Sequence, residues 1–304
     1  MEYMSVRQAS EQWRLSDRRV RLLCAQGRIL GVVREGRSYL IPVAAVKPAD
    51  GRSLRGKVVP QEYSALFARV DALKAELGKR RPFTQGELKR LNEEFLVEFT
   101  FNSNAIEGNT LTLRETALVL EGITIDQKPL KDHLEVVGHR DAFLYVQQLI
   151  TDKIQISETI IKNIHSLVLM DRPNDKGVYR RIPVAIMGAI HDPPQPYLVP
   201  VHMEMLIAGQ KSTKHHPIEN AALFHLDFEG VHPFIDGNGR TGRLVLNLML
   251  MQQGYVPIDV KYLDRKRYYD CFDSYYKDKA AAPMVKMIAE YLVEQLQKYL
   301  VILD

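Results

Sequence analysis

Residues 232–243 read His-Pro-Phe-Ile-Asp-Gly-Asn-Gly-Arg-Thr-Gly-Arg, and a largely apolar run, residues 244–253, follows directly. Gly237 and Gly239 flank an asparagine, and glycine adopts the left-handed conformations that tight turns require. Backbone N–H groups in such a turn can converge on one anion, and a following helix adds its own unpaired N–H groups. The stretch therefore predicts an anion-binding loop at the start of a helix.

The polar side chains of this stretch point to phosphate chemistry. Arg240, Arg243 and Asn247 share one face of the predicted helix by their spacing, and the planar guanidinium of arginine donates two parallel hydrogen bonds to phosphate. Asp236 adds a carboxylate, and Mg²⁺ is usually held by one or two carboxylates together with substrate phosphates. His232 adds an imidazole, which is suited to accept a proton near neutral pH. Together they favour transfer of a phosphorus-containing group over a purely structural turn.

These residues match, without departure, the Fic family signature His-x-Phe-x-(Asp/Glu)-Gly-Asn-Gly-Arg-x-x-Arg. The resemblance extends from about Glu94 to Glu294 and includes Gly177-Val178-Tyr179-Arg180. The usual reaction of the family moves AMP from ATP to a protein hydroxyl. The resemblance therefore implies a mainly α-helical domain of the Fic type, with ATP as substrate, Mg²⁺ as cofactor and a protein as target.

The resemblance also assigns a role to each polar residue of the stretch. His232 would deprotonate the target hydroxyl, and Asp236 would hold Mg²⁺. The phosphates and nucleoside of ATP would be bound by Gly237, Asn238, Gly239, Arg240, Arg243 and Asn247.

A second motif, Ser103-Asn104-Ala105-Ile106-Glu107-Gly108, resembles the inhibitory element Ser/Thr-x-x-x-Glu-Gly/Asn of the same family. Ser103 and Glu107 are one helical turn apart, and glycine is suited to end a helix. The resemblance implies that Glu107 pairs with Arg243 and thereby occupies the arginine that the γ-phosphate of ATP needs. In some relatives this glutamate also positions water to remove AMP from a modified target, and the sequence leaves that activity open.

A third segment predicts a β-hairpin. Residues 184–190 are rich in β-branched side chains, residues 192–196 form a proline-rich turn, and residues 197–199 can return as a second strand. In Fic relatives such a hairpin is a flap that docks the target by strand addition; a plain surface hairpin is the alternative. The resemblance gives the docking role to Ile186, Met187 and Gly188.

The N-terminal segment predicts a small winged helix-turn-helix. Ser5 and Ser16 can cap helices over residues 6–13 and 17–26, and residues 29–41 form two strands around a tight turn. The segment resembles the MerR/excisionase type, whose second helix enters the major groove of DNA. A helical docking module with solvated arginines is the alternative. The resemblance implies DNA contacts by Arg18, Arg19, Arg21, Arg34 and Arg37.

Charge and composition divide the chain. Residues 1–57 carry 12 Lys or Arg and 5 Asp or Glu, in a chain whose total net charge is +4. Such a concentration of positive charge indicates a polyanion partner for this segment. The predicted domains are a winged helix-turn-helix at 1–50, a linker at 51–60, and a Fic domain with its inhibitory helix at 61–304.

Composition also excludes several classes of protein. The chain has 304 residues, of which 46% are hydrophobic and 26% are charged, as in ordinary globular proteins. No apolar run approaches the ~20 residues that span a bilayer, and the N-terminus lacks the pattern of a secretion signal. Cys24 and Cys271 are too few for a disulfide framework, so we expect a reducing, cytoplasmic compartment. A homodimer is the default expectation, because two-fold dimers are the commonest assemblies.

From residue 61 onward the apolar periodicity predicts helices. Capping boxes at Thr84–Glu87 and Thr112–Glu115 open two of them, the first ending near Phe101. Further helices are predicted over residues 131–151, 157–170, 217–229, 240–253, 265–278 and 283–303.

Two functions of different classes fit the sequence. The first is an autoinhibited AMP transferase that acts on a Ser, Thr or Tyr hydroxyl of another protein or of the chain itself. The second is a DNA-binding transcriptional regulator that senses a nucleotide in the Fic pocket. Some relatives transfer UMP or phosphocholine, but no departure in the motif indicates such a donor.

Overall fold

The computed structural model describes residues 3–13, 15–25, 29, 31–36, 38–43, 45, 61–186, 188–211 and 215–303. The chain divides into two compact units, Met1–Val58 and Val59–Asp304, and each is described by itself. The predicted linker, residues 51–60, lies outside the described residues. Among the helices in the described ranges, none combines the length and apolar character needed to cross a membrane.

The first unit joins two helices and a three-stranded sheet around one apolar core. Its antiparallel strands lie in the order β1 (Tyr3–Ser5), β3 (Ser38–Pro42) and β2 (Val33–Glu35). Helices α1 (Val6–Trp13) and α2 (Asp17–Ala25) contribute the other side of the core. The order of elements along the chain is helix, turn, helix and hairpin, with β1 added as an edge strand.

Local signals account for these elements. The hydroxyl of Ser16 accepts a hydrogen bond from the N–H of Arg19 at 3.2 Å, as its predicted capping role requires. Gly36 has a φ of 58° in the turn between β2 and β3, where a left-handed residue is needed. The two predicted helices and the hairpin are confirmed as elements, whereas β1 is too short to give a periodic signal and was not predicted.

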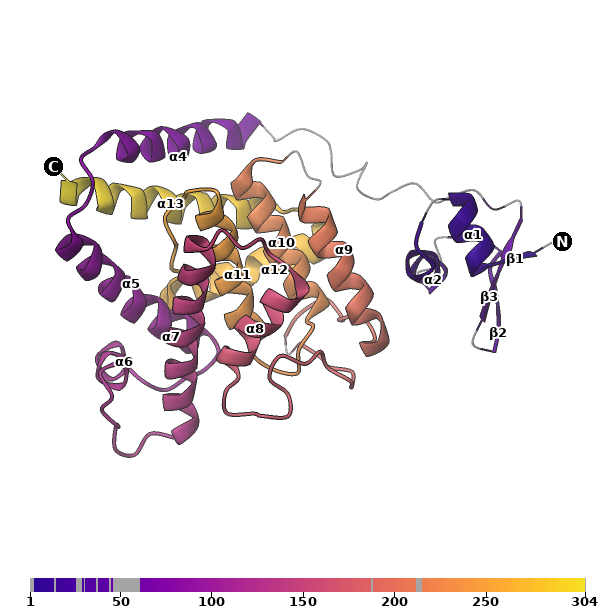
Figure 1. Cartoon of the computed structure of the whole chain (residues 1–304), viewed down its shortest axis with the longest axis horizontal. Helices are drawn as coiled ribbons and strands as arrows, with labels where there is room; N and C mark the ends of the chain where they lie inside the picture. The colour runs from indigo at the N-terminus through magenta and orange to yellow at the C-terminus, as the bar shows by residue number, and fades with distance from the viewer. Residues whose placement is uncertain are drawn as a thin grey trace. The chain divides into compact units, whose positions relative to one another are not determined.

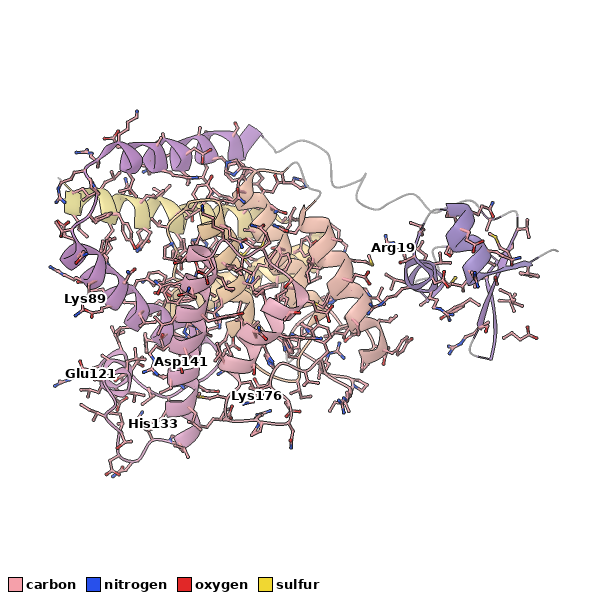
Figure 2. The ribbon with its side chains drawn as sticks, viewed as in Figure 1. Arg19, Lys89, Glu121, His133, Asp141 and Lys176 are labelled. Atoms are coloured by element: carbon pink, nitrogen blue, oxygen red, sulfur yellow. The ribbon has the colours of Figure 1, made fainter. Side chains whose placement is uncertain are left out.

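The arginines assigned to DNA contact are only partly described. Arg18 and Arg21 on α2 and Arg34 on β2 are exposed, and Arg19, labelled in Figure 2, is half-buried. Arg37 lies outside the described residues.

The second unit is a helical bundle centred on α11 (Asn238–Gln252). This helix packs against α10 (Pro217–Val231), α7 (Leu130–Thr151), α8 (Glu158–Val168) and α5 (Gln85–Ile106), and Figure 1 shows it in the middle of the bundle. Twelve of the fifteen residues of α11 are buried, including Arg240, Arg243 and Asn247. A helix enclosed in this way carries its arginines into the interior, where each of them needs a partner.

Other helices complete the bundle around this centre. They are α4 (Gln61–Lys79), α6 (Leu113–Leu120), α9 (Val199–Lys211), α12 (Arg265–Asp278) and α13 (Ala282–Leu303), with the short 3₁₀ turns η1 (Pro196–Leu198) and η2 (Tyr262–Asp264). α4 packs along α13 (Figure 1).

The end of α5 differs from the prediction in a way that matters for the site. Both predicted capping boxes, at Thr84 and Thr112, are confirmed. However, α5 continues past its predicted end near Phe101, so that Ser103 lies within the helix and Glu107 becomes its C-cap residue.

The predicted β-hairpin flap is wrong. No described residue between 181 and 195 belongs to a strand, and η1 and α9 occupy the place of the returning strand. The prolines of this segment cannot donate to a strand ladder. Instead, the guanidinium of Arg180 donates to the carbonyl oxygens of Ile182 and Pro194, at 3.3 and 2.5 Å. The Arg180 side chain therefore holds the segment at two carbonyl groups, and no described residue pairs with it as a strand.

Candidate active site

The loop that carries the motif lies between two residues in the left-handed conformation. His232 has φ and ψ of 47° and 61° and ends α10, and Gly237 has a φ of 73° and begins α11. A non-glycine residue in this conformation is uncommon and costs energy, and such residues concentrate at functional sites. The two reversals turn the chain sharply, so that the imidazole and the first turn of α11 belong to one short loop.

The side chains of Arg180 and Asn238 hold this loop in place. The Arg180 side chain donates to the carbonyl oxygen of His232 at 2.7 Å, and the Arg180 backbone N–H donates to that of Pro233 at 2.9 Å. The amide of Asn238 exchanges two hydrogen bonds with the backbone of Phe234, each 2.9 Å long. The Asn238 side chain therefore closes the loop, which is a different task from the phosphate contact that was predicted for it.

His165 also holds the loop in place, through the backbone of Asp236. Its Nδ1 accepts a hydrogen bond from the N–H of Gly177 at 2.8 Å, so its Nε2 carries the proton and donates to the carbonyl oxygen of Asp236 at 2.9 Å. Its ring stacks on Phe234 with the centroids 3.6 Å apart. Burial lowers the pKa of His165 to about 4. His165 is thus a neutral, structural histidine.

His232 has the properties of a base in this loop. The His232 side chain is largely buried, and burial lowers the pKa of its imidazole to about 4. The nearby backbone of Glu229 acts in the opposite direction and raises the pKa by a smaller amount. The Nδ1 of His232 faces Glu229, whose carboxylate oxygen Oε2 lies 3.9 Å away. The imidazole is therefore neutral at physiological pH and can accept a proton.

Asp236, which the sequence predicts to hold Mg²⁺, is bound within the loop. Its Oδ1 accepts the N–H of Gly237 at 2.6 Å, and its Oδ2 lies 3.0 Å from the guanidinium of Arg172. Within the described ranges, no group of three or more His, Cys, Asp or Glu side chains could hold a metal ion by itself. A single carboxylate of this kind suits Mg²⁺ that is shared with phosphate oxygens, not a metal cage built by the protein alone.

Arg243 lies in the interior with its guanidinium fully engaged. Its Nε donates to Oγ of Ser103 at 3.0 Å, and its Nη2 donates to the Ser103 carbonyl oxygen at 2.7 Å and to Oε1 of Glu107 at 2.8 Å. The Arg243 side chain is 1% exposed, whereas that of Glu107 is 32% exposed. The structure thus brings together the two sequence motifs, which are separated by more than a hundred residues.

The Glu107 carboxylate also lies over the first turn of α11. A Cβ atom placed on Gly239 would come within 2.1 Å of Oε1 of Glu107. Only glycine allows this approach, and the N-terminus of a helix favours a negative charge. The carboxylate therefore occupies the position at which the predicted loop would bind an anion.

The other predicted nucleotide contacts have protein partners. Arg240 lies 3.0 Å from Glu135 and 3.5 Å from Asp236. Asn247, predicted to face the nucleoside, instead exchanges two hydrogen bonds with the backbone of Ile258, at 2.8 and 2.9 Å. Glu135 comes from α7 and has no signal in the motif, so sequence reasoning did not find it.

Two of the residues assigned to target docking, Ile186 and Gly188, are described. The N–H of Ala189 donates to the carbonyl oxygen of Ile186 at 3.1 Å, and Gly188 is exposed with a φ of 78°. Met187 lies outside the described residues. Docking by these residues remains a prediction, now without a preformed strand.

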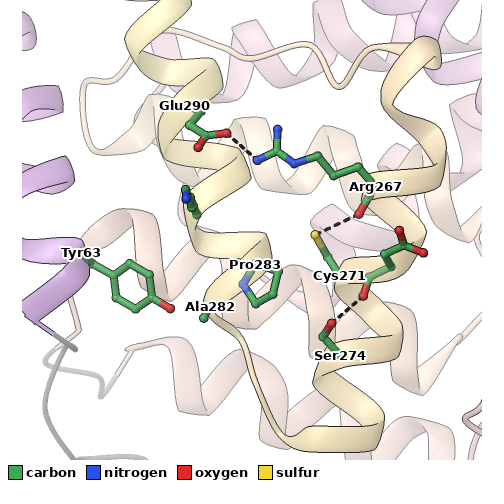
Figure 3. A pocket seen from close by; sticks show the side chains of 9 residues that line it. Tyr63, Arg267, Cys271, Ser274, Ala282, Pro283 and Glu290 are labelled. Atoms are coloured by element: carbon green, nitrogen blue, oxygen red, sulfur yellow. Dashed lines mark hydrogen bonds and ion pairs between the residues drawn. The ribbon is translucent and has the colours of Figure 1, made fainter.

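A cavity of about 530 Å³ lies elsewhere in the second unit, between α4, α12 and α13 (Figure 3). Its walls include Cys271 and the ion pair between Arg267 and Glu290. No residue of the 232–243 motif lines it. We therefore place the candidate active site at the loop before α11 and not in this cavity.

Comparison with known proteins agrees with this geometry. Residues 155–250 match the model of the Fic/DOC family. Among curated proteins, the chain is 35% identical over 223 residues to the protein adenylyltransferase Fic of Drosophila yakuba, an alignment covering 71% of this chain and 44% of the relative. It is 32% identical over 273 residues to that of Drosophila willistoni, covering 86% and 54%. The chain thus spans about half the length of the curated relatives it matches.

Solved structures show the same similarity. Fic-1 (residues 134–508) of C. elegans superposes with a TM-score of 0.69 at 28% identity, covering 84% of this chain and 77% of that one. A Fic-domain-containing signalling protein of Bacteroides thetaiotaomicron gives a TM-score of 0.68 at 27% identity, covering 79% and 96%. The chain therefore contains a Fic domain and has the protein adenylyltransferases Fic among its homologues.

Proposed function

We propose that the chain is an autoinhibited protein adenylyltransferase, which moves AMP from ATP to a Ser, Thr or Tyr hydroxyl of a protein. This proposal rests on one observation: the Glu107 carboxylate lies against Gly239 and accepts a hydrogen bond from Arg243. An internal carboxylate already lies where the outer phosphates of ATP would bind. The homologues named as protein adenylyltransferases support the same chemistry.

The proposed step needs one base and one anion site. The target oxygen forms a bond to the α-phosphorus of ATP, and the bond from that phosphorus to the oxygen bridging the α- and β-phosphates breaks. The hydroxyl proton passes to His232, and pyrophosphate leaves. The N–H groups of Asn238 and Gly239 at the start of α11 and the guanidinium of Arg243 are in place before substrate arrives, and such preorganised donors stabilise developing negative charge without rearrangement.

Asp236 would hold Mg²⁺ together with phosphate oxygens of ATP. The ion would neutralise phosphate charge during the transfer. The Asp236 carboxylate is held at the loop by the Gly237 N–H, and one of its oxygens faces the exposed Arg172. Binding of the ion would therefore displace the Arg172 guanidinium.

Inhibition follows from competition for Arg243. While Glu107 accepts from Nη2 of Arg243, the γ-phosphate of ATP cannot use the same donor, and two anions at one site repel each other. ATP can then bind only with its phosphates displaced from the position that the reaction requires. The same glutamate could orient water to remove AMP from a modified target, and we keep this reverse use of the site as the alternative activity.

Intact mass spectrometry tests the proposed activity. The Glu107→Gly chain is incubated with ATP and Mg²⁺, alone and with candidate targets, and compared with the Glu107→Gly/His232→Ala chain. An AMP adduct that forms only when His232 is present is the expected result. An adduct that survives loss of His232 contradicts the assigned base, and absence of any adduct with every target contradicts the transferase.

We also propose that the first unit binds DNA through a winged helix-turn-helix. Exposed Arg18 and Arg21 on α2 and Arg34 on β2 support this proposal, together with the basic charge of the segment. Gel-shift assays with Arg18→Ala and Arg21→Ala should show weaker binding. Arg7→Ala, which removes an exposed arginine of α1, is the matched control. Equal affinities in all variants would contradict DNA binding by α2.

A regulator that senses nucleotide makes a separate prediction. DNA affinity should then change on addition of ATP and should keep this response in the His232→Ala chain. A response that depends on His232 would instead couple DNA binding to AMP transfer.

A further inference from the structure

Glu229 is a carboxylate in an unusual place. It lies on the last turn of α10, and its side chain is 13% exposed. A Cβ atom placed on Gly242 of α11 would come within 2.5 Å of Oε1 of Glu229, so the carboxyl group is wedged between the two helices. Within the described part of the protein, Oε1 is buried and has no hydrogen-bond partner. A buried carboxyl group without a partner calls for an explanation in function.

The imidazole of His232 also carries a buried polar atom whose hydrogen bonding is incomplete. Its Nδ1 is buried, makes no hydrogen bond of normal geometry among the described residues, and lies 3.9 Å from Oε2 of Glu229. The backbone of Glu229 lies close enough to raise the pKa of the imidazole, but burial outweighs this effect. Hydrogen bonds of active sites are often long in the absence of substrate and shorten when it binds. A small rotation of the Glu229 carboxyl group would bring the two atoms into contact.

A chain of polar groups runs from Arg243 through Tyr268 to His225, whose ring lies near Glu229 at Gly242. Arg243 can only donate, so the hydroxyl of Tyr268, 3.5 Å away, accepts from it and donates to Nε2 of His225 at 2.7 Å. The proton of His225 then resides on Nδ1, which lies near Gly242, as Oε1 of Glu229 does. Oε2 of Glu229 therefore faces the imidazole of His232, while Oε1 lies beside Gly242 near the ring of His225.

We propose that Glu229 is the positioning residue of His232: its carboxylate accepts the Nδ1 proton and leaves Nε2 to take the proton of the target hydroxyl. This proposal rests on the proposed adenylyltransferase activity. A neutral imidazole has two tautomers, and only the one with a bare Nε2 can act as a base at that atom. A third group that orients the base is a general feature of such sites.

The ionisation of Glu229 links this positioning to inhibition. Burial, followed by the negative charge of Glu107, raises the pKa of Glu229 to about 8, against the lowering effect of Arg243. A protonated Glu229 could donate to Nδ1 and favour the wrong tautomer of His232. Departure of Glu107 removes one of the charges that keep Glu229 protonated. The titratable and charged groups that face Glu229 are Glu107 of α5, His225 and His232 at α10, Arg243 of α11, and Tyr268 and Tyr269 of α12.

The tautomer of His232 can be read directly by ¹⁵N NMR of the histidine rings, with the full chain and without substrate. The chain has nine histidines, and a His232→Ala chain assigns the signal. We expect a protonated Nδ1 and a bare Nε2 above pH 8, and a mixture or the reverse tautomer in Glu229→Gln and Glu229→Ala. Glu219→Gln is the matched control, because Glu219 lies on the same helix, is 15% exposed and faces His215.

Kinetics in the Glu107→Gly background supply the second measurement. Glu229→Gln should lower kcat for AMP transfer by about 10- to 100-fold, as loss of a partner that orients a functional histidine does, and leave KM for ATP unchanged. The rise of kcat with pH through the pKa of Glu229 should disappear in this variant, and Glu219→Gln should retain both kcat and its pH profile. A His232 tautomer that is the same with and without Glu229 overturns the proposal, whatever the activity. A chain that transfers no AMP but shows the tautomer shift contradicts the proposed function and leaves the positioning intact.

Discussion

Two ion pairs of the candidate active site differ in burial, and the difference indicates which arginine stays in place when its carboxylate partner leaves. Arg243 is 1% exposed and keeps two hydrogen bonds to Ser103 in addition to its pair with Glu107. Arg172, which pairs with Asp236, is 40% exposed. A guanidinium fixed in the interior stays in place when its carboxylate partner leaves, so it is ready for a phosphate. An exposed guanidinium is displaced at little cost, because surface pairs contribute only about 0–1 kcal/mol.

The largest effect is expected from changes at the buried pair. In the Glu107→Gly background, Arg243→Lys should lower kcat for AMP transfer by about 100-fold or more, because loss of one preorganised donor costs on that order. Lysine keeps the charge but has one ammonium nitrogen in place of the planar fork, whose separate nitrogens hold Ser103 and can donate in parallel to a phosphate. Unfolding temperatures of both chains serve as the control for folding. A variant with undiminished kcat contradicts the role of Arg243 as the phosphate partner.

Acid should weaken both regions together, because each is supported by a buried neutral histidine. Burial lowers the pKa of His165, below Asp236, to about 4, and that of His225, next to Tyr268 and Arg243, to about 3, from an ordinary value of 6.5. The unfolded chain takes up these protons near pH 6.5 and the folded chain does not. Their contribution to stability is therefore complete above pH 6.5 and is lost as the pH falls toward 4, by about 2 kcal/mol per histidine at pH 5.

Urea unfolding at pH 7 and pH 5 measures this loss. Glu229 acts in the opposite direction, because its pKa is raised to about 8 and its stabilising contribution is complete below 4.5 and lost as the pH rises through 8. The Glu229→Gln chain should therefore lose more stability between pH 7 and pH 5 than the wild type. Identical losses in the two chains would contradict the assigned pKa of Glu229.

The substitution Gly239→Ala tests whether the Glu107 carboxylate lies against the first turn of α11. The added Cβ would meet Oε1 of Glu107 at 2.1 Å, and the flexible glutamate should swing away and lose its bond to Arg243. We expect Gly239→Ala to lower the free energy of unfolding by about 1–3 kcal/mol, the range for a hydrogen bond to a charged group. The same substitution in the Glu107→Gly background should cost much less. Equal costs in the two backgrounds would place Glu107 elsewhere in solution.

The exposed pair should give the smallest effect. Arg172→Ala removes the cation that competes for Asp236, so the Mg²⁺ concentration that half-saturates AMP transfer should fall by up to about 5-fold, equivalent to the ~1 kcal/mol of a surface pair. Arg90→Ala, which breaks the exposed pair with Glu94 on α5, is the matched control. A rise in the Mg²⁺ requirement on loss of Arg172 would instead give this arginine a part in binding.

The sequence predicts most of what is local in the candidate site. His232, Asp236 and the Gly237 turn lie within a few residues of each other, and their chemistry follows from the motif. Pairing of Glu107 with Arg243 was implied by family resemblance, and the structure shows this contact at 2.8 Å. Local signals such as capping boxes also predicted where helices begin, because the bonds that define them join neighbouring residues.

The wrongly predicted β-hairpin and the partners that the sequence did not indicate both concern contacts made across the fold. The flap was predicted from β-branched residues and a turn, but Arg180 holds that segment at two carbonyl groups. The partners of Arg240 and Asn247, namely Glu135 and Ile258, come from other parts of the unit and leave no trace in the motif. A buried polar side chain needs a partner, but the sequence pattern around it does not indicate which residue provides that partner.

The most direct test of the account is incorporation of AMP from α-labelled ATP into protein by three chains. They are the wild type, Glu107→Gly and Glu121→Gly. Glu121 is the matched control, since it also caps a helix (α6) and also precedes a glycine with positive φ, Gly122. The account predicts a rise of about ten-fold or more in Glu107→Gly alone, the factor that corresponds to roughly 1.4 kcal/mol. Equal incorporation by the wild type and Glu107→Gly, or an equal rise in Glu121→Gly, would contradict it.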